Sequence, residues 1–426
     1  MTEPRKRSRR FWWALSIFSL MGQVAWVVEN MYFNVFIYKM FNASAADISA
    51  MVAASAVTAT LTTVLMGALS DKMGKRRFFI SWGYILWGVS IFSFVFVRED
   101  LIASLFPTLS AAATGITLAI TLDCVMTFFG STANDAAFNA WLTDSTDEGN
   151  RGAAEGINAM MPLMAILVVF GGFMFFDLSR PESWTTIFAV IGVLVFGIGL
   201  LGLFLIEEPK IAPVKVGYWK SVFYGFSPAA IGANPSLYVA LAAFILFNIA
   251  IQIFMPYLIL YYEVSLGMAD YVLIMAPAII LASVATALWG KVYDKKGFAF
   301  SGLFAMGGLL AGFVVLYFTR STLLVFVGSL LMMCGYLCGM AVFGALIRDN
   351  TPIGKSGMLQ GVRIFSQVLI PGVIGPYIGK WVLDGAKTIV NGDGTTSFVP
   401  TADIFLAALV VAVLVLPFFA LVKKKK

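Results

Sequence analysis

The chain has 426 residues, of which 60% are hydrophobic and 12% are charged, and its mean hydropathy is +0.89. Soluble domains carry about 45–50% apolar and about 25% charged residues, so this composition excludes a water-soluble globular protein. The sequence contains no His, which excludes histidine proton relays and histidine metal sites.

Apolar runs long enough to cross a bilayer recur along the whole sequence. A helix needs about 20 predominantly apolar residues to span the hydrocarbon core. Such runs are predicted at 11–37, 47–69, 78–97, 114–142, 153–176, 184–206, 236–262, 270–290, 298–318, 321–347, 357–383 and 402–422. The sequence therefore predicts an all-α membrane protein with 12 transmembrane helices.

Lys and Arg are distributed unequally between the two sides of the predicted membrane. Twelve crossings place both termini on one side, and all but six of the 29 Lys and Arg fall on that side. The exceptions are Lys39, Arg98, Arg180, Arg320, Lys380 and Lys387. The positive-inside rule then predicts cytoplasmic N- and C-termini in a plasma or inner cell membrane. The net charge of +6 follows from this topology and requires no nucleic-acid partner.

The chain contains an internal repeat. Gly67-Ala-Leu-Ser-Asp71-Lys-Met-Gly74, after the second predicted helix, matches Gly290-Lys-Val-Tyr-Asp294-Lys-Lys-Gly297, after the eighth, at an offset of 223. A second match, around Asp144 and Asp349, has an offset of 205 and places an insertion of about 18 residues near 98–115. Two matches in the same order predict two pseudo-symmetric six-helix halves. Their predicted bounds are 1–206 and 236–426, with a cytoplasmic linker at 207–235.

These motifs resemble those of a known family. The 67–77 loop, Gly-x-x-x-Asp-x-x-Gly-Lys-Arg-Arg, resembles the cytoplasmic signature of the major facilitator superfamily. Thr132-Ala-Asn-Asp135, followed by Trp141-Leu-Thr-Asp144, resembles the glycoside–pentoside–hexuronide:cation symporters of that superfamily, and Gly22-Gln23-x-x-Trp26-x-x-Glu29 is similar to the related disaccharide–proton symporters. The resemblance implies solute uptake coupled to H⁺ or Na⁺, with Asp135 serving the cation, the sugar or both.

The sequence departs from that family at positions that bear on the coupling ion and the substrate. Sodium-coupled members carry two acids one turn apart in helix two, where this chain has Ala59 and Thr63. H⁺ is therefore favoured over Na⁺, and no other cofactor is expected. Asn139 stands where the family has an aromatic residue that stacks on sugar, and the Arg expected early in helix five is absent, with Asn158 near its place. The resemblance therefore does not extend to the family's sugar-specificity residues.

Three carboxylates are predicted well inside the membrane, at Glu29, Asp123 and Asp135. Placing a charged side chain at the middle of the bilayer costs a few kcal/mol of free energy, so each of these acids is expected to have a functional or structural role. Asp135 is nine residues from Asp144, or roughly 13 Å deeper along the helix, which suits reversible protonation. Thr132 is predicted to belong to the same cation- or proton-coupling site. The alternative is a structural Asp bonded to neighbouring Asn and Thr. Asp123 is predicted as a second proton site or an outer gate, and Glu29 is the rival proton carrier.

Amide side chains recur on the first and seventh predicted helices. Gln23, Asn30 and Asn34 follow an i, i+7, i+11 spacing, and Asn248 and Gln252 follow i, i+4. Amides both donate and accept hydrogen bonds, so they suit a neutral polyol; the alternative is that they join helices to one another. Further predicted substrate-binding residues are Trp26, Asn134, Asn139, Asn158, Arg363 and Gln367. Arg363 could equally form a gate or a structural ion pair.

The repeated acids at the cytoplasmic joints predict a gate. Acids there can pair with basic side chains and with the positive N-terminal ends of helices, which would favour closure on that side. The predicted gating residues are Asp71, Arg76, Asp144, Asp294 and Asp349. The alternative is that they are solvated loop charges.

The expected function is proton-coupled import of a small polar solute, such as a sugar or glycoside, by alternating access. The 20 Met and the many aromatic residues leave open a drug, amphiphile or lipid carrier of the same fold, since Met-rich surfaces adapt to varied ligands. A membrane receptor or scaffold without transport is the third alternative. The sequence shows no nucleophile–base constellation and no nucleotide loop, so no enzyme is expected. The expected partners are a small-molecule substrate and the lipid bilayer, with the chain as a monomer.

Overall fold

The computed structural model describes residues 8–146, 150–209, 223–268, 270–352, 356–390 and 396–421. Contacts divide the chain into a first unit, residues 1–43 with 57–222, and a second unit, residues 44–56 with 223–426. Helix α3 (Ala45–Met73) is divided between the two units. Its residues up to 56 belong to the second unit, and its residues from 57 onward belong to the first. The predicted halves, 1–206 and 236–426, stay a prediction, and residues 210–222 of the predicted linker lie outside the described part.

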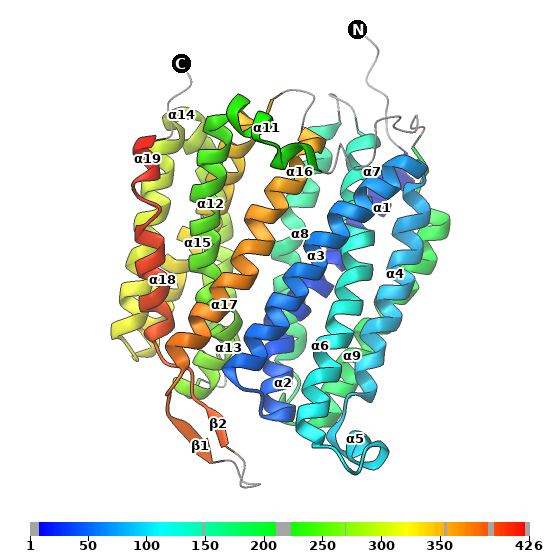
Figure 1. Ribbon diagram of the computed structural model, residues 1–426, viewed down its shortest axis with the longest axis vertical. Helices are drawn as coiled ribbons and strands as arrows, with labels where there is room; N and C mark the ends of the chain where they lie inside the picture. Colours follow the sequence, from blue (N-terminus) through cyan, green and yellow to red (C-terminus); the bar gives the residue numbers. More distant parts are fainter. Residues whose placement is uncertain are drawn as a thin grey trace. The chain divides into compact units, whose positions relative to one another are not determined.

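The first unit is a bundle of long helices, several of which change helix type along their length (Figure 1). The first segment comprises α1 (Arg9–Val27), a π-helical turn (Val28–Tyr32) and α2 (Phe33–Phe41). After α3 follow α4 (Arg76–Ser93), a 3₁₀ turn (Phe94–Phe96), α5 (Glu99–Leu105), α6 (Ala111–Gly130), a π-helical segment (Ser131–Phe138), α7 (Asn139–Asp144), α8 (Arg151–Phe173) and α9 (Pro181–Leu205). The short helix α5 occupies the segment where the repeat predicts an insertion.

The second unit contains further long helices and a hairpin that the sequence did not predict. Its elements are a 3₁₀ turn (Tyr224–Phe226), α11 (Pro228–Ala233), α12 (Pro235–Phe254), a 3₁₀ turn (Met255–Tyr257), α13 (Leu258–Leu260), a π-helical turn (Tyr261–Ser265), α14 (Val272–Phe318), α15 (Thr322–Asn350), α16 (Ser356–Ile364), a π-helical turn (Phe365–Leu369), α17 (Ile370–Leu383), β1 (Thr388–Val390), β2 (Thr396–Phe398), α18 (Asp403–Val413) and α19 (Phe418–Leu421). Strands β1 and β2 pair antiparallel, with Thr388 opposite Phe398.

The described residues contain 11 helices that are long and apolar enough to cross a membrane. One of them, α14, is 47 residues long and covers both the eighth and the ninth predicted runs. Its backbone leaves helical geometry at Gly297, where φ is +76°, so α14 makes two crossings. Glycine adopts this left-handed conformation without a steric cost. The predicted all-α fold with 12 transmembrane helices is confirmed, whereas the loop expected between 290 and 298 is reduced to the break at Gly297.

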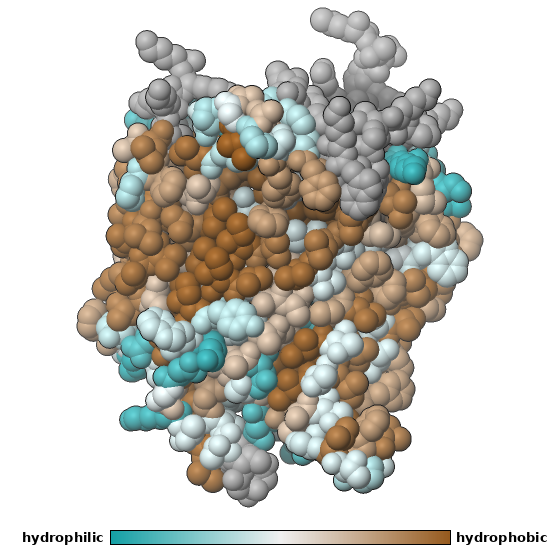
Figure 2. All heavy atoms as spheres, in the orientation of Figure 1, coloured by the Kyte–Doolittle hydropathy of each residue, from teal (hydrophilic) through white to brown (hydrophobic). Residues whose placement is uncertain are grey.

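Large apolar side chains cover the outer faces of these helices. Phe204 of α9 and Phe318 of α14 are 75% and 78% exposed, respectively, and Figure 2 shows apolar side chains along α12 and α18. Trp87, Trp141 and Trp184 are fully buried. A helix that is apolar on both its buried and its exposed faces suits a lipid environment, since neither face could be left in water. The chain is therefore an integral membrane protein.

Candidate functional site

A hydrogen-bonded network joins α1, α4 and the π-helical segment Ser131–Phe138 in the first unit. Trp26 Nε1 donates to Asn134 Oδ1 at 3.3 Å. Asn134 Nδ2 donates to the Tyr84 hydroxyl at 2.8 Å, and that hydroxyl donates to the Phe18 carbonyl at 2.7 Å. Asn134 is 4% exposed. Because both ends of its amide have partners, Asn134 is held in one orientation among three helices.

Gly22 of α1 makes this network sterically feasible. A Cβ atom at position 22 would lie 2.1 Å from Asn134 Nδ2 and 2.7 Å from the Tyr84 hydroxyl oxygen. Both distances are far below van der Waals contact. Any larger residue at position 22 would therefore displace the Asn134 amide or separate α1 from α4.

Asp135 lies in the π-helical segment Ser131–Phe138. Such segments occur frequently at functional sites. Asn139 Nδ2 donates to the carbonyls of Asn134 at 3.3 Å and of Asp135 at 3.1 Å, which fixes the irregular backbone. Ser131 Oγ donates to Asp135 Oδ2 at 3.0 Å. Asp135 is partly buried and makes no ion pair with another described residue.

Thr132, which is predicted to belong to the same coupling site as Asp135, forms no hydrogen bond with the Asp135 carboxylate. Thr132 Oγ1 instead donates to the Phe128 carbonyl at 2.7 Å, one turn back on the same helix. Ser131 is the residue that donates to Asp135, at the spacing of four that places two side chains next to each other on a helix.

Two further carboxylates lie together elsewhere in the first unit. Thr127 Oγ1 donates to Glu29 Oε1 at 2.9 Å, and both side chains are buried. Asp123, one turn before Thr127 on α6, is 2% exposed, and its Oδ1 has no hydrogen-bond partner among the described residues. The two carboxyl groups are close enough to interact electrostatically. The structure thus brings together Glu29 and Asp123, which the sequence places on different helices.

The amides of the first helix do not share one environment. Asn34 is 1% exposed, whereas Asn30 is exposed to solvent or lipid. Asn30 Nδ2 donates to the Trp26 carbonyl at 2.8 Å, and Asn34 Nδ2 donates to the Asn30 carbonyl at 3.4 Å. Gln23 is partly buried. The π-helical turn Val28–Tyr32 includes Asn30, and Asn30 and Asn34 differ in exposure although a hydrogen bond joins them. Their shared role in binding stays a prediction.

The remaining predicted binding residues lie in both units. In the first unit, Ser19 Oγ donates to Asn158 Oδ1, which joins α1 to α8. In the second unit, Asn248 is buried and donates to the Phe244 carbonyl at 2.8 Å. Gln252, Arg363 and Gln367 are partly buried, and their side chains form no hydrogen bond with another described residue. Their roles in binding stay predictions.

Arg76 connects the predicted gating acids at one end of the first unit. Its side chain is 4% exposed and forms ion pairs with Asp71 and with Asp144, the second at 2.9 Å from Nε to Oδ2. It also donates to Ser70 Oγ. The Arg77 backbone N–H donates to Glu208 Oε2 at 3.1 Å, so the residues after α9 cap the start of α4. Three of the five predicted gating residues therefore form one cluster.

The equivalent acids of the second unit are arranged differently. The Tyr293 hydroxyl donates to Asp349 Oδ2 at 2.6 Å. Asp294 is exposed and forms no ion pair with another described residue. At the repeat offset of 223, the position equivalent to Arg76 is Ala299, so the arginine that bridges the two acids of the first unit is not repeated there.

The sequence did not predict several residues that hold the site together. Tyr84, Ser131 and Thr127 each bond directly to a predicted site residue. Single hydroxyl groups on apolar helices carry no distinctive pattern, so only the spacing of four between Ser131 and Asp135 could have indicated a contact. The contacts of Tyr84 and Thr127 require the packing of helices far apart in sequence.

A bundle of membrane-crossing helices with acids and amides buried among them defines a polytopic membrane protein with the architecture of a transporter. The sequence model of the Major Facilitator Superfamily matches residues 11–376. The chain therefore belongs to the Major Facilitator Superfamily. No curated protein matches it in sequence.

Solved structures share this fold at low sequence identity. The crystal structure of the nucleoside transporter NupG is 14% identical, with a TM-score of 0.67 over 97% of this chain and 99% of that one. A bacterial homolog of the human lysosomal transporter Spinster is 16% identical, with a TM-score of 0.70 over 98% of both chains. The xylose transporter XylE from E. coli is 14% identical, with a TM-score of 0.70 over 95% of this chain and 96% of that one. These likenesses establish the fold alone.

Proposed function

We propose that the chain is a secondary active transporter that couples the movement of a small polar solute to protons by alternating access. The observation that carries this proposal is Asp135. This residue is partly buried within a membrane-spanning helix, and its carboxyl group bonds to Ser131 Oγ and has no Lys or Arg partner among the described residues. Intramembrane acids are rare and costly, and they typically mark ion pathways or proton relays.

The surroundings of Asp135 suit an acid that gains and loses a proton. Asn134 and Asn139 fix the backbone on both sides of it through the Trp26–Asn134–Tyr84 network and the two carbonyl contacts. The carboxyl group can therefore change its protonation state without loss of the helix. Glu29 and Asp123 form a second acidic group, and mutual repulsion of two carboxylates away from water favours a proton on one of them. H⁺ remains our proposal for the coupling ion, with no other cofactor.

A hydroxylated solute is the substrate class that we propose, in line with the resemblance to glycoside–pentoside–hexuronide:cation symporters. NupG and XylE are a nucleoside and a xylose transporter, respectively, and both solutes carry several hydroxyl groups. The amides Gln23, Asn30, Gln252 and Gln367 are partly or fully accessible and can both donate to and accept from hydroxyl groups. An amphiphile carrier and a non-transporting receptor remain the competing functions.

We further propose that the Arg76 cluster closes the cytoplasmic side, with both termini on that side of a plasma or inner membrane and the chain acting as a monomer. A panel of sugars, glycosides, nucleosides and amphiphiles, screened by thermal shift on the purified protein, would identify the solute, because a ligand of the folded state raises its apparent stability. That solute should then raise the external pH of lightly buffered proteoliposomes as it enters. A solute that binds but enters without any change in external pH would contradict proton coupling. Stabilisation of the protein by amphiphiles alone would favour the alternative function as an amphiphile carrier.

A further inference from the structure

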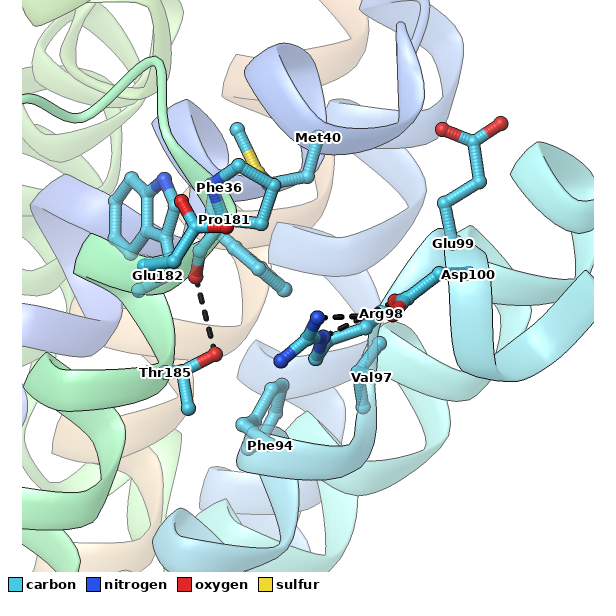
Figure 3. Close-up of a pocket in the computed structure, with 11 residues that line it drawn as sticks. Phe36, Met40, Phe94, Val97, Arg98, Glu99, Asp100, Pro181, Glu182 and Thr185 are labelled. Atoms are coloured by element: carbon cyan, nitrogen blue, oxygen red, sulfur yellow. Dashed lines mark hydrogen bonds and ion pairs between the residues drawn. The ribbon is translucent and has the colours of Figure 1, made fainter.

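The first unit contains a cavity away from the polar network described above. Its volume is about 500 Å³, and its walls come from the end of α2, the segment after α4, and the start of α9 (Figure 3). The lining residues are Phe36, Met40, Phe94, Val97, Arg98, Glu99, Asp100, Pro181, Glu182, Trp184 and Thr185. Ligand pockets range from about 300 to 1,000 Å³, so a monosaccharide-sized molecule fits this volume.

Arg98, on one wall of the cavity, is held in position by an ion pair with Asp100. Its Nε and Nη2 atoms donate to the two carboxylate oxygens of Asp100 at 3.0 and 2.8 Å. The hydrogen bond from Arg98 holds the pKa of Asp100 below its usual range, so this pair stays ionised. The third nitrogen, Nη1, has no hydrogen-bond partner among the described residues, and Figure 3 shows the guanidinium group directed toward Thr185. Because Asp100 neutralises the positive charge, Nη1 is a donor for a neutral oxygen and not an anion site.

The opposite wall, formed by α9, carries a negative charge that nothing among the described residues neutralises. The Glu182 carboxylate forms no hydrogen bond or ion pair with another described residue. It acts electrostatically on Arg98 but lies beyond ion-pair distance from it. Thr185 Oγ1 donates to the Pro181 carbonyl at 3.0 Å, so its oxygen is left to accept a hydrogen bond from a ligand. This wall therefore accepts hydrogen bonds and attracts a cation.

The remaining lining is apolar apart from Glu99, whose carboxylate points away from the other labelled side chains in Figure 3. Phe36 packs against Trp184 with ring centroids 5.3 Å apart, and Trp184 Nε1 is used in a hydrogen bond to the Leu178 carbonyl. The aromatic cluster therefore offers no polar group to a ligand. Met40 and Phe36 can contact the C–H face of a ring-shaped molecule.

We infer that this cavity binds a hydroxylated organic cation of the amino-sugar or amino-alcohol type. The ammonium group pairs with Glu182, a hydroxyl group donates to Thr185 Oγ1, and Arg98 Nη1 donates to a ligand oxygen. The inference rests on the proposed function, because it specifies the class of transported solute as a positively charged polyol. This solute would bind in the cavity before it reaches the membrane-spanning site. Binding itself can be measured without transport.

The test is isothermal titration calorimetry on the full-length protein in nanodiscs, with glucosamine, N-acetylglucosamine and glucose as probes. At a pH where the glucosamine amine is protonated, we expect it to bind about tenfold more tightly than the two neutral sugars, a difference of about 1.4 kcal/mol. Glu182→Gln should remove this preference. Asp177→Asn should keep it, because Asp177 is an exposed acid next to α9 that does not line the cavity.

Equal affinity for the three sugars, or a preference for glucosamine that survives Glu182→Gln, would overturn the inference. Thr185→Val provides a second test. This variant should bind glucosamine more weakly but still prefer it to the neutral sugars. An unchanged affinity for glucosamine would count against the hydrogen bond assigned to Thr185 Oγ1. Because Glu182 is exposed, Glu182→Gln should fold like the wild type, and an unchanged melting temperature would show that it does. Glucosamine binding without any solute-linked proton movement would contradict the proposed function and leave this site standing.

Discussion

Thr127 donates a hydrogen bond of 2.9 Å to Glu29, which lies 98 residues earlier in the chain. The contact joins α6 to the π-helical turn of the first membrane-spanning segment, and both side chains are buried. Asp123 lies one turn away on α6, so a single hydroxyl group fixes the position of one carboxyl group relative to another. A change at Thr127 should therefore affect both stability and the protonation of this acidic pair.

Thr127→Val keeps the shape of the side chain but removes the donor. We expect the free energy of unfolding, measured by titration with a denaturing detergent, to fall by about 1–3 kcal/mol, because a buried polar atom of Glu29 loses its hydrogen bond. Thr127→Ser keeps the hydroxyl group and should recover most of that loss. If both variants unfold like the wild type, the hydrogen bond does not contribute to stability.

Gly22→Ala should destabilise the protein by about 1–3 kcal/mol, as overpacking typically does. The added methyl group would overlap the Asn134 amide and the Tyr84 hydroxyl. The matched control is Gly197→Ala on α9, where a Cβ atom would meet nothing within 4 Å. Because Ala favours a helix over Gly by up to about 1 kcal/mol, this control should leave the melting temperature unchanged or raise it. Equal losses in the two variants would show that the packing around Asn134 is not special.

Arg76→Ala should cost about 1–3 kcal/mol, less than the loss of a fully buried ion pair, because Asp71 and Asp144 are 47% and 25% exposed, respectively. A double-mutant cycle with Asp144→Ala measures the coupling between the two side chains. Arg77→Ala is the control, since the Arg77 side chain is exposed and forms no ion pair with another described residue. A coupling energy near zero would mean that Arg76 does not hold the predicted gate together.

The helical fold could be predicted from the sequence because its cause is local. Each apolar run is long enough to span the hydrocarbon core, and the repeat of Asp71 at Asp294 indicated two related halves. Gly297 shows the limit of this reasoning: the glycine is part of the sequence repeat, but the repeat does not show that its positive φ forms the whole connection between two helical segments. The hairpin of β1 and β2 was also missed, since its strands have only three residues each.

The candidate site could be predicted only in part because most of its contacts join helices that are far apart in sequence. Asp135 and Asn134 were identified as polar residues within an apolar helix. The bond between Ser131 and Asp135 has the spacing of four that a regular helix predicts, whereas the bonds of Asn134 to Trp26 and Tyr84 join residues of different helices. Asn30 and Asn34 are also joined by a hydrogen bond at a spacing of four, but only Asn34 is buried by the neighbouring helices.

The central claim is that Asp135 carries the coupling proton. Its most direct test compares solute accumulation by wild-type and Asp135→Asn proteoliposomes under an inward proton gradient, with the solute found in the thermal-shift screen. The wild type should concentrate the solute above its external level, whereas Asp135→Asn should only exchange labelled for unlabelled solute without net accumulation. Gradient-driven accumulation by Asp135→Asn at the wild-type level would contradict the claim.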